Sequence, residues 1–305
     1  MNSRLSLRQL RYFASAAKHG SFKRAAEVMN VSASSISLSV GQLEGVIGCQ
    51  LFERRHARGL VLTDAGKETL IEARNVLSGV EGIEQSGGRR DGGLEGALEV
   101  GVLRSLAPYV IPAFLEAFRA RYPGIDVYIS EGVISDLLSG LVSGRSDLAL
   151  TYDTDLPAAI RTWPVLDLPP RILVAQGHPL AGLSRASLRD FEDYPYILAD
   201  YANTRDYIFS IFADCGLGLP RIAQRVQSFE LLRNLVGRSD AYALVNMCPP
   251  YGNDPDAPVR TIEILEEVRT PVLSLAGLRR VRPNPAQEAF IALAQEMIGS
   301  EMLLR

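Results

Sequence analysis

The chain has 305 residues, of which 47% are hydrophobic and 22% are charged, and its formal net charge is −3. These values indicate a globular protein with ample core, divided into two or three domains of ordinary size. The N-terminus lacks the apolar core of a signal peptide and no apolar run is long enough to span a bilayer, so we expect no membrane segment and a cytoplasmic location. Three widely spaced cysteines without nearby histidines, Cys49, Cys215 and Cys248, indicate neither a disulfide framework nor a zinc site.

The net charge conceals a strong asymmetry between two parts of the chain. Residues 1–63 contain nine Lys and Arg against three Glu, which gives +6, so residues 64–305 carry −9. Such an asymmetry indicates a nucleic-acid partner, because a basic surface is attracted to phosphates. We therefore expect the N-terminal part to bind DNA.

Three short helices are predicted in this basic part. Apolar residues recur at helical spacing from Leu7 onward, and His19-Gly20 ends the first helix. Ser21 can cap a second helix, and Ser32 can cap a third with an apolar stripe on one side and small and polar residues on the other. Two short helices joined by a tight turn, the second with such an outer face, are typical of a helix inserted in a DNA major groove.

A hairpin is predicted after the third helix, where apolar segments bracket residues 53–59 and the tip holds three arginines. We expect these arginines to bind phosphates or the minor groove, because only Glu53 is close in sequence; Arg54 could also have a structural role. The predicted DNA-binding residues are Ser32, Ala33, Ser34, Ser35, Ser37, Leu38, Gln42, Arg54, Arg55 and Arg58. For the serines the alternative is capping and backbone bonding in the first turn, which is the favoured interpretation for Ser32.

The ordered residues of this N-terminal part resemble the LysR-type transcriptional regulators, bacterial proteins with a winged helix-turn-helix and a C-terminal effector-binding domain. The matching positions are Leu7, Leu10, Phe13, Gly20-Ser21-Phe22, Ala25-Ala26, Val31-Ser32, Ile36-Ser37, Leu43-Glu44, Ile47-Gly48, Leu51-Phe52, Arg54, Leu62-Thr63 and Gly66. The family usually places Gln at the position of Ala33 and often a basic residue at that of Leu38. Ala and Leu can only touch a thymine methyl, so direct readout is expected to depend on the serines and Gln42, with shape readout through the wing.

Residues 64–86 are predicted to form one long helix, because apolar residues recur at helical spacing without a proline. About 22 residues at 1.5 Å each give a length of about 33 Å. The resemblance implies a linker helix that pairs with its twin in a second subunit and places two DNA-binding domains about 34 Å apart. Packing back on its own domain is the alternative. The glycine-rich residues 87–94 are predicted to be a hinge.

After the hinge, strands and helices alternate, which predicts an α/β region with mainly parallel sheets. The predicted strands are Leu98–Val102, Ile125–Ile129, Asp147–Tyr152, Ile172–Ala175, Tyr196–Leu198, Tyr242–Val245 and Val272–Leu275. Looser marks of the resemblance here include Pro112, Tyr122-Pro123, Glu131-Gly132, Asp147-Leu148-Ala149 and His178-Pro179-Leu180. For residues 95–305 the resemblance implies a periplasmic-binding-protein-like fold with two Rossmann-like lobes. We expect lobe I at 95–166 and 270–305 and lobe II at 167–269, with a ligand site in the cleft between them.

Ligands of open α/β folds bind beyond the carboxyl ends of strands, where helix N-termini attract anions. The predicted effector-binding residues lie in such turns or beside them: Arg104, Ser105, Leu106, Val133, Tyr152, Asn203, Thr204, Arg205 and Phe229. The resemblance implies that Ser105 matches a Ser or Thr that holds an effector carboxylate in many members. The alternatives are that Ser105 and Thr204 cap helices and that Arg205 pairs with Asp200 or Asp206. We expect a small effector that carries an anionic group.

Other classes of function are disfavoured. No phosphate-binding loop, nucleophile elbow or dinucleotide fingerprint occurs and the three histidines are dispersed, so we expect neither an enzyme nor a metal or other cofactor. A solute-binding module is disfavoured by the basic N-terminal part. Redox sensing through Cys215 and Cys248 is the alternative within the family, although no run of basic residues lies beside them to stabilise a thiolate.

The sequence therefore predicts a winged helix-turn-helix, a long linker helix and a two-lobed α/β domain in a homodimeric or homotetrameric transcription regulator. We expect it to bind a dyad site in double-stranded DNA, with the effector changing the geometry of the paired DNA-binding domains.

Overall fold

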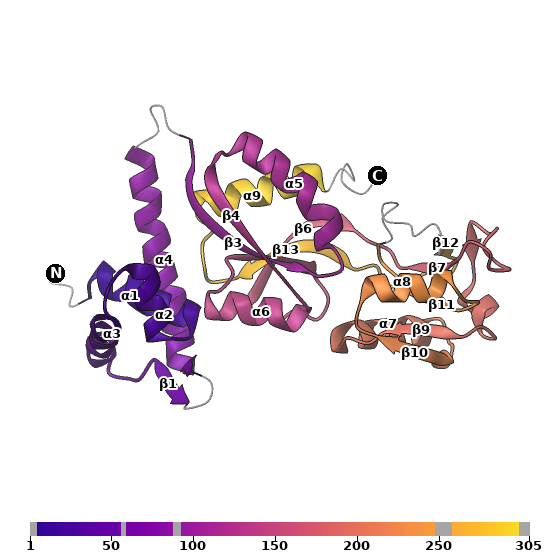
Figure 1. Cartoon of the computed structure of the whole chain (residues 1–305), viewed down its shortest axis with the longest axis horizontal. Coiled ribbons are helices and arrows are strands. Elements are labelled where there is room, and N and C mark those ends of the chain that lie inside the picture. The colour runs from indigo at the N-terminus through magenta and orange to yellow at the C-terminus, as the bar shows by residue number, and fades with distance from the viewer. Residues whose placement is uncertain (1–4, 56–58, 88–92, 248–257, 299–305) are drawn as a thin grey trace.

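The computed structural model describes residues 5–55, 59–87, 93–247 and 258–298. Figure 1 shows a helical head, a long helix that runs up beside the middle of the molecule, and two α/β lobes that follow one another away from the head. Each lobe has its own sheet. The predicted fold class is confirmed.

The head consists of three helices and a hairpin: α1 (Leu7–His19), α2 (Phe22–Met29), α3 (Ala33–Ile47), β1 (Phe52–Arg55) and β2 (Gly59–Leu62). Each helix begins after a serine whose hydroxyl accepts a backbone N–H, and these serines are Ser6, Ser21 and Ser32. Each helix ends at a residue in the left-handed conformation, as at Gly20 and Asn30. The three helices and the hairpin predicted from the sequence are therefore present.

The long helix α4 (Asp64–Gly87) follows the hairpin without a break and contains the predicted 64–86 segment. Its first turn lies close against the head, because a Cβ atom at Gly66 would stand 2.1 Å from the carbonyl oxygen of Leu51. Only glycine fits at this point. The Gly66 N–H also donates to the hydroxyl of Thr63 at 2.9 Å, which fixes the start of the helix.

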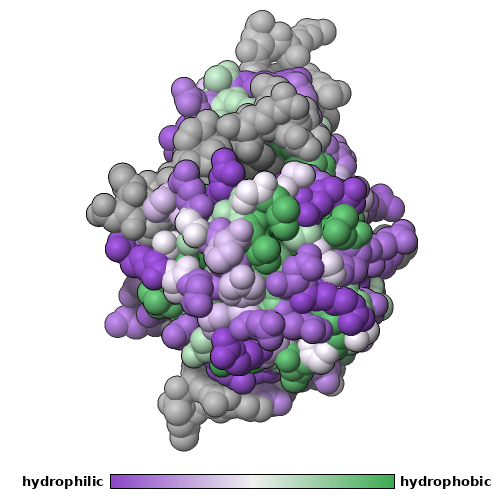
Figure 2. Space-filling model, turned by 90° about the vertical axis from the view of Figure 1, so that its right-hand side faces the viewer, coloured by the Kyte–Doolittle hydropathy of each residue, from purple (hydrophilic) through white to green (hydrophobic). Residues whose placement is uncertain are grey.

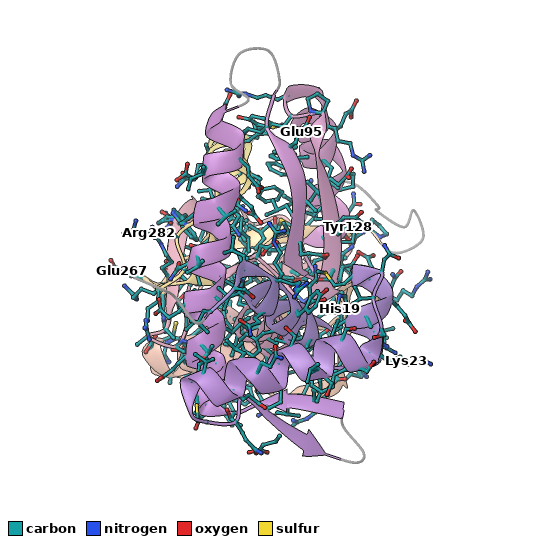
Figure 3. All side chains as sticks on the ribbon, turned by 90° about the vertical axis from the view of Figure 1, so that its left-hand side faces the viewer. His19, Lys23, Glu95, Tyr128, Glu267 and Arg282 are labelled. Atoms are coloured by element: carbon teal, nitrogen blue, oxygen red, sulfur yellow. The ribbon has the colours of Figure 1, made fainter. Side chains whose placement is uncertain are left out.

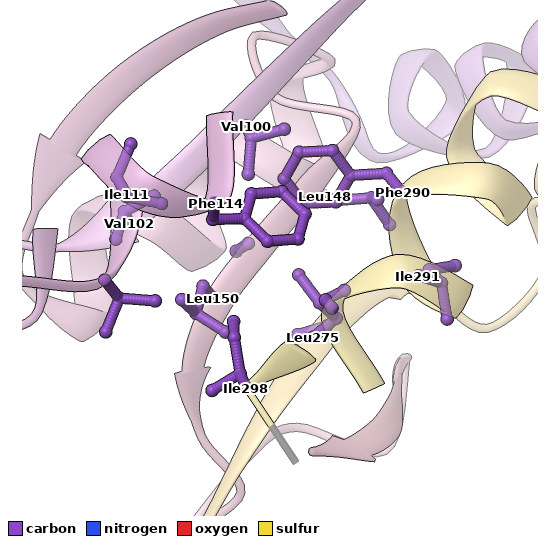
Figure 4. Close-up of a cluster of buried hydrophobic side chains, with 14 of the residues drawn as sticks. Val100, Val102, Ile111, Phe114, Leu148, Leu150, Leu275, Phe290, Ile291 and Ile298 are labelled. Atoms are coloured by element: carbon purple, nitrogen blue, oxygen red, sulfur yellow. The ribbon is translucent and has the colours of Figure 1, made fainter. Parts of the chain in front are cut away.

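Lobe I contains a five-stranded sheet in the order β4-β3-β5-β13-β6. Its strands are β3 (Glu95–Leu103), β4 (Gly124–Gly132), β5 (Leu148–Tyr152), β6 (Ile160–Asp167) and β13 (Val272–Leu278), and its helices are α5 (Ala107–Arg121), α6 (Ile134–Ser143) and α9 (Pro285–Met297). α5 and α9 lie on one face of the sheet and α6 on the other (Figure 1). Between the sheet and α5 and α9, Phe114 packs against Phe290 with ring centroids 4.8 Å apart, in the core shown in Figure 4.

Lobe II contains a six-stranded sheet in the order β10-β9-β11-β7-β12-β8. Its strands are β7 (Arg171–Ala175), β8 (Arg185–Ala186), β9 (Tyr196–Ala199), β10 (Ile222–Val226), β11 (Tyr242–Val245) and β12 (Val259–Ile264); its helices are the 3₁₀ turn η1 (Leu188–Phe191), α7 (Ala202–Asp214) and α8 (Phe229–Gly237). Tyr196 and Tyr242 are fully buried in one of its two cores. At this end of the molecule, hydrophobic side chains lie in small groups among hydrophilic ones (Figure 2).

The expectation of mainly parallel sheets needs correction. In lobe I, β4, β3 and β5 are parallel, but β13 runs antiparallel to both β5 and β6. In lobe II, β7 runs antiparallel to both β11 and β12. β7 and β13 are the strands that begin after the chain has crossed from one lobe to the other. They enter each sheet against the direction of the parallel strands, so both sheets are mixed.

The linker helix α4 packs on lobe I of its own chain. Arg74 forms an ion pair with Asp147 at 2.8 Å and donates to the carbonyl oxygen of Leu141 at 3.3 Å. In the head, Lys18 pairs with Glu99 of β3 at 2.8 Å. Figure 3, viewed from the head end, shows α4 standing alongside the strands of lobe I. Head, α4 and lobe I are therefore joined by polar contacts within one chain.

Candidate functional site

One face of α3 points away from the hydrophobic core of the head and is exposed. Ile36, Val40 and Leu43 are buried against α1 and α2, whereas Leu38 is 66% exposed and Gln42 is exposed. Ala33, Ser34 and Ser35 are exposed in the first turn, and Ser37 is half-buried. Leu38 is the most exposed of the large apolar residues of α3, ahead of Val46 at 41% and Ile47 at 38%, and an exposed leucine is consistent with a face that is covered when the protein is bound.

The serines at the start of α3 interact with one another. The Ser32 side chain accepts the N–H of Ser35 at 3.1 Å, and its hydroxyl lies 2.9 Å from that of Ser34 and 2.7 Å from that of Ser35. Ser32 is thus the N-cap, as favoured from the sequence. Ser34 and Ser35 remain exposed at the same helix end, where backbone N–H groups and the positive end of the helix dipole face solvent.

The wing is an antiparallel pair in which Arg54 lies opposite Leu60 and Arg55 opposite Gly59. Arg54 and Arg55 therefore lie on strand β1 and not at the tip of the hairpin, which corrects the expectation that the tip carries all three arginines. Arg58 lies outside the described residues. The wing is anchored to the head through β2, because Leu60 donates its N–H to the carbonyl oxygen of Gly20 at 2.9 Å.

A cavity of about 570 Å³ lies between the two lobes. The turns that follow β3, β4, β9 and β10 line it, as expected for the carboxyl ends of parallel strands. Seven of the predicted effector-binding residues line this cavity: Arg104, Ser105, Leu106, Val133, Tyr152, Thr204 and Phe229. These residues come from both lobes, so the cavity is closed only when the lobes lie together.

Arg205, one of the predicted effector-binding residues, does not line the cavity. Arg205 pairs with Asp200 at 3.4 Å and with Asp206 at 3.6 Å, as its alternative interpretation stated. Asn203 lies in the first turn of α7, but its side chain is outside the described part of the structure. Among the described residues that line the cavity, Arg104 is the one arginine.

Four helices begin at the cavity, namely α5, α6, α7 and α8. α6 and α8 carry acidic side chains in their first turns, Asp136 and Glu230, and these negative charges interact favourably with the positive ends of the helix dipoles. α5 and α7 have no acidic residue in the first turn, and their N-cap residues Leu106 and Tyr201 make no side-chain capping bond. Neither α5 nor α7 therefore has an acidic side chain in its own first turn, and Asp200, directly before the N-cap of α7, also lines the cavity.

Tyrosines form part of the cavity wall. Burial raises the pKa of the Tyr152 hydroxyl, so this group stays neutral and can donate a hydrogen bond. Burial also raises the pKa of Tyr201, while the positive charge of Arg104 opposes the shift. Arg104 thus lies within electrostatic range of the N-terminus of α7, on the opposite lobe.

The sequence did not indicate the contact that joins the lobes across the cavity mouth. The Tyr109 hydroxyl of α5 donates to a carboxylate oxygen of Glu230 in α8, and its ring meets that of Phe229 with centroids 6.3 Å apart. Burial, followed by the hydrogen bond and the negative charge of Glu230, raises the pKa of Tyr109 to about 12. Pairing between residues of two helices over 120 positions apart leaves no local pattern by which it could have been found.

A second polar cluster holds the segments that cross between the lobes. Asn246 donates to the carbonyl oxygen of Leu168 at 2.8 Å and to the hydroxyl of Tyr207 at 2.9 Å. Tyr207 in turn donates to the carbonyl oxygen of Arg269 at 3.3 Å. Leu168 precedes β7 and Arg269 precedes β13, so one cluster touches both crossings.

Two free cysteines lie in the part of the chain that the structure describes. Cys49 is exposed and Cys215 half-buried, both as free thiols, while Cys248 falls outside the described residues. Burial raises the pKa of the Cys215 thiol, and Glu266 and Asp214 raise it further. Among the described residues no group of His, Cys, Asp and Glu could hold a metal ion. No helix in these ranges is long and apolar enough to cross a membrane.

A winged helix-turn-helix head with a free α3 face, joined by a long helix to a two-lobed region with an interlobe cavity, defines a ligand-responsive DNA-binding protein. Comparison with known proteins agrees with this class of protein. Residues 7–67 match the family model described as bacterial regulatory helix-turn-helix protein, lysR family. Residues 91–299 match the LysR substrate binding domain.

Relatives match over nearly the whole chain. The uncharacterized HTH-type transcriptional regulator YvbU of Bacillus subtilis is 25% identical over 97% of this chain and 100% of its own length. The DNA-binding transcriptional dual regulator OxyR of Escherichia coli is 25% identical over 79% of each chain. The crystal structure of HinK, a LysR family transcriptional regulator from Pseudomonas aeruginosa, is 32% identical with a TM-score of 0.65 and covers 97% of this chain and 99% of its own.

The chain belongs to the LysR family of DNA-binding transcriptional regulators. Members of this family bind DNA and small-molecule effectors and form oligomers.

Proposed function

We propose that α3 and the β1–β2 wing are the DNA-contacting surfaces. The observation that supports this proposal is the α3 face, where Ser34, Leu38 and Gln42 are exposed on a helix whose other side is buried. Gln42 can make a bidentate contact to adenine, and Leu38 can contact a thymine methyl. Arg54, Arg55 and Arg58 provide phosphate or minor-groove contacts that do not depend on base sequence.

The test separates base reading from phosphate binding. Replacing Gln42→Ala should change relative affinities among different DNA sites, whereas Arg54→Ala with Arg55→Ala should weaken binding to all DNA and reduce the salt slope by about 2. The matched control is Arg119→Ala with Arg121→Ala, which removes two cations from lobe I. Equal losses on all sites for Gln42→Ala would show that it does not read bases.

We propose that the effector carries an anionic group, which lies between the N-termini of α5 and α7. The first turns of both helices lack acidic residues, their N-cap residues make no side-chain capping bond, and Arg104, Ser105 and Thr204 line the cavity beside them. Helix N-termini bind carboxylates and phosphates through free N–H groups and the helix dipole. Because the two helices belong to different lobes, an anion held by both would favour the closed arrangement.

Thermal shift measurements with a panel of small carboxylic acids, each paired with its neutral amide, test this proposal. We expect stabilisation by some acids but not by their amides, and its loss in Ser105→Ala and Arg104→Gln. Arg205→Gln is the matched control, since it also removes one guanidinium but Arg205 itself does not line the cavity. Amides that stabilise as well as the acids would contradict an anion site.

We propose further that the active form is a dimer or tetramer that binds a dyad site in the cytoplasm. Val76 and Ile83 of α4 are 46% and 73% exposed, as expected for a helix that pairs with its twin. In this proposal the chain is divided into a DNA-binding domain at 1–63, a linker helix at 64–86, a hinge at 87–94, and an effector domain at 95–305 with lobe II at 167–269. Ile83→Lys should lower the oligomeric state in sedimentation velocity, whereas Glu84→Lys should not.

Thiol-based sensing is the second candidate, because several relatives are named hydrogen peroxide-inducible genes activators. The environment of Cys215 opposes it, since a raised pKa reduces the thiolate fraction that reacts with peroxide. We therefore expect Cys215→Ser with Cys248→Ser to leave DNA binding unchanged both with and without peroxide. A peroxide response that this double variant loses would restore the redox function.

A further inference from the structure

A second pocket of about 410 Å³ lies on the outer surface of lobe I, away from the interlobe cavity. It is formed by strand β6, helix α9 and the turn before α9, and its wall includes Arg161, Trp163, Arg282, Glu288, Ile291 and Gln295. None of these residues lines the cavity between the lobes. We call it the outer pocket.

Two guanidinium groups at the outer pocket have no acidic partner in the described part of the chain. Arg161 lies over the ring of Trp163 with its guanidinium carbon 4.3 Å from the ring centroid. Arg282 uses only its backbone N–H in a hydrogen bond, donated to Asn75 of α4 at 3.0 Å. Within the described residues neither arginine side chain forms an ion pair, although Glu288 lies in the same wall.

The chemistry of the wall selects a class of ligand. Trp163 and Ile291 form the apolar part of the wall, and the part of the Trp163 ring that the Arg161 guanidinium leaves uncovered suits an edge contact with a second aromatic ring. Two arginines against one glutamate leave a net charge of +1, which a monoanion balances. A guanidinium pairs with a carboxylate through two parallel hydrogen bonds. We propose that the outer pocket binds a small aromatic monocarboxylate, with its ring against Ile291 and the part of Trp163 that Arg161 leaves uncovered, and its carboxylate between Arg161 and Arg282.

The position of the outer pocket gives such a ligand access to the linker helix. The turn that carries Arg282 is bonded to α4 at several points. Asn75 donates to the carbonyl oxygen of Arg280 at 2.8 Å, Arg280 pairs with Glu72 at 2.6 Å, and Asn284 donates to Glu81 at 3.2 Å. Figure 3 shows Arg282 beside α4. A ligand at the outer pocket would therefore contact the same turn that holds lobe I to the linker helix.

The chain itself provides the reporter, because Trp163 is its single tryptophan. Phenylacetate is the probe, phenylacetamide is its neutral counterpart, and tryptophan emission of the full-length protein is followed during titration with each. We expect a saturable change with phenylacetate and none with phenylacetamide. Arg161→Gln and Arg282→Gln should each weaken binding by about tenfold, whereas Arg161→Lys should weaken it less.

Two controls separate the outer pocket from other effects. Arg119→Gln removes an exposed cation of α5 outside the pocket, and Ser105→Ala alters the interlobe cavity; both should leave the phenylacetate titration unchanged. Unchanged emission with millimolar phenylacetate would overturn the proposal, as would equal binding of phenylacetamide or wild-type affinity in both arginine variants. Loss of the titration in Ser105→Ala would place the ligand in the interlobe cavity and would also refute the outer pocket.

Discussion

Replacing Tyr109→Phe tests whether the contact across the cavity mouth holds the lobes together. This change removes only the hydroxyl that donates to Glu230, and it keeps the ring that packs against Phe229. The apolar part of the contact therefore stays, and any effect on lobe closure reports on the hydrogen bond alone.

The expected free-energy contribution of the hydrogen bond follows from the solvent exposure of Tyr109 and Glu230. A hydrogen bond to a charged acceptor contributes about 1.5–3 kcal/mol when it is shielded from solvent. Tyr109 is half-buried and Glu230 is exposed, so solvent screening lowers the contribution to about 1 kcal/mol. A change of about 1 kcal/mol shifts the ratio of closed to open lobes by about fivefold toward the open form.

Distance distributions between two spin labels measure this ratio directly. The labels are placed at Glu116→Cys in lobe I and Gln224→Cys in lobe II, both exposed, in a variant whose native cysteines are replaced by serine. We expect a larger fraction of long distances for Tyr109→Phe. The matched control is Tyr128→Phe, because Tyr128 is a 56% exposed tyrosine of lobe I outside the cavity wall.

Two results would refute this reasoning. The first is a distribution for Tyr109→Phe that matches both the unsubstituted protein and the Tyr128→Phe control. The second is an opening of the same size in Tyr128→Phe, which would show that loss of any hydroxyl in lobe I loosens the structure.

Three further predictions concern pH, the head and the linker helix. The pKa of Tyr109 is raised to about 12, so the contribution of its hydroxyl to lobe closure should be fully present below pH 10, the ordinary tyrosine pKa. This contribution should disappear as the pH rises through 12. Spin-label distances should show this loss in the parent protein and not in Tyr109→Phe. Gly66→Ala should destabilise the head by about 3 kcal/mol in urea unfolding, because its Cβ would overlap a backbone oxygen, whereas Gly82→Ala, which meets nothing within 4 Å, should stabilise α4 by about 0.5–1 kcal/mol. Arg74→Met should weaken the attachment of α4 to lobe I by about 1–3 kcal/mol, and a double-mutant cycle with Asp147→Asn should show a coupling energy above zero.

The head was the most predictable part of the fold, because its signals are local. The serine caps at Ser21 and Ser32 and the stop at Gly20 each act within one helical turn, and all three are present in the structure. The wing was less predictable at the residue level, because assigning Arg54 and Arg55 to a strand requires the register with the opposite strand.

In the lobes, seven strands were predicted from the sequence, and β6, β8, β10 and β12 were missed. β6 contains Pro164 and lies at the edge of its sheet, where a proline is tolerated, so its sequence does not read as a regular strand. β10 is also an edge strand, and three of its residues are exposed. The direction of β7 and β13 depends on the crossings between lobes, which no local pattern records.

The position of the interlobe cavity could be predicted from a general rule for parallel strands. Turns after parallel strands converge at one sheet edge, so Arg104, Ser105 and Val133 could be named in advance. Tyr109 was missed because it lies on a helix and acts only against the other lobe. Arg205 was misplaced because nearby acidic residues compete with a ligand for its guanidinium.

The contacts within one chain restrict how effector binding can reach DNA. The head and α4 are tied to lobe I through Lys18–Glu99 and Arg74–Asp147, whereas lobe II meets lobe I at the Tyr109 contact and at the two crossings. Closure around an effector would therefore move lobe II relative to a unit formed by the head, α4 and lobe I. Within one subunit such a movement leaves the head in place on lobe I. In an oligomer, contacts of lobe II with a neighbouring subunit would shift instead, and the spacing of the two heads would change through them.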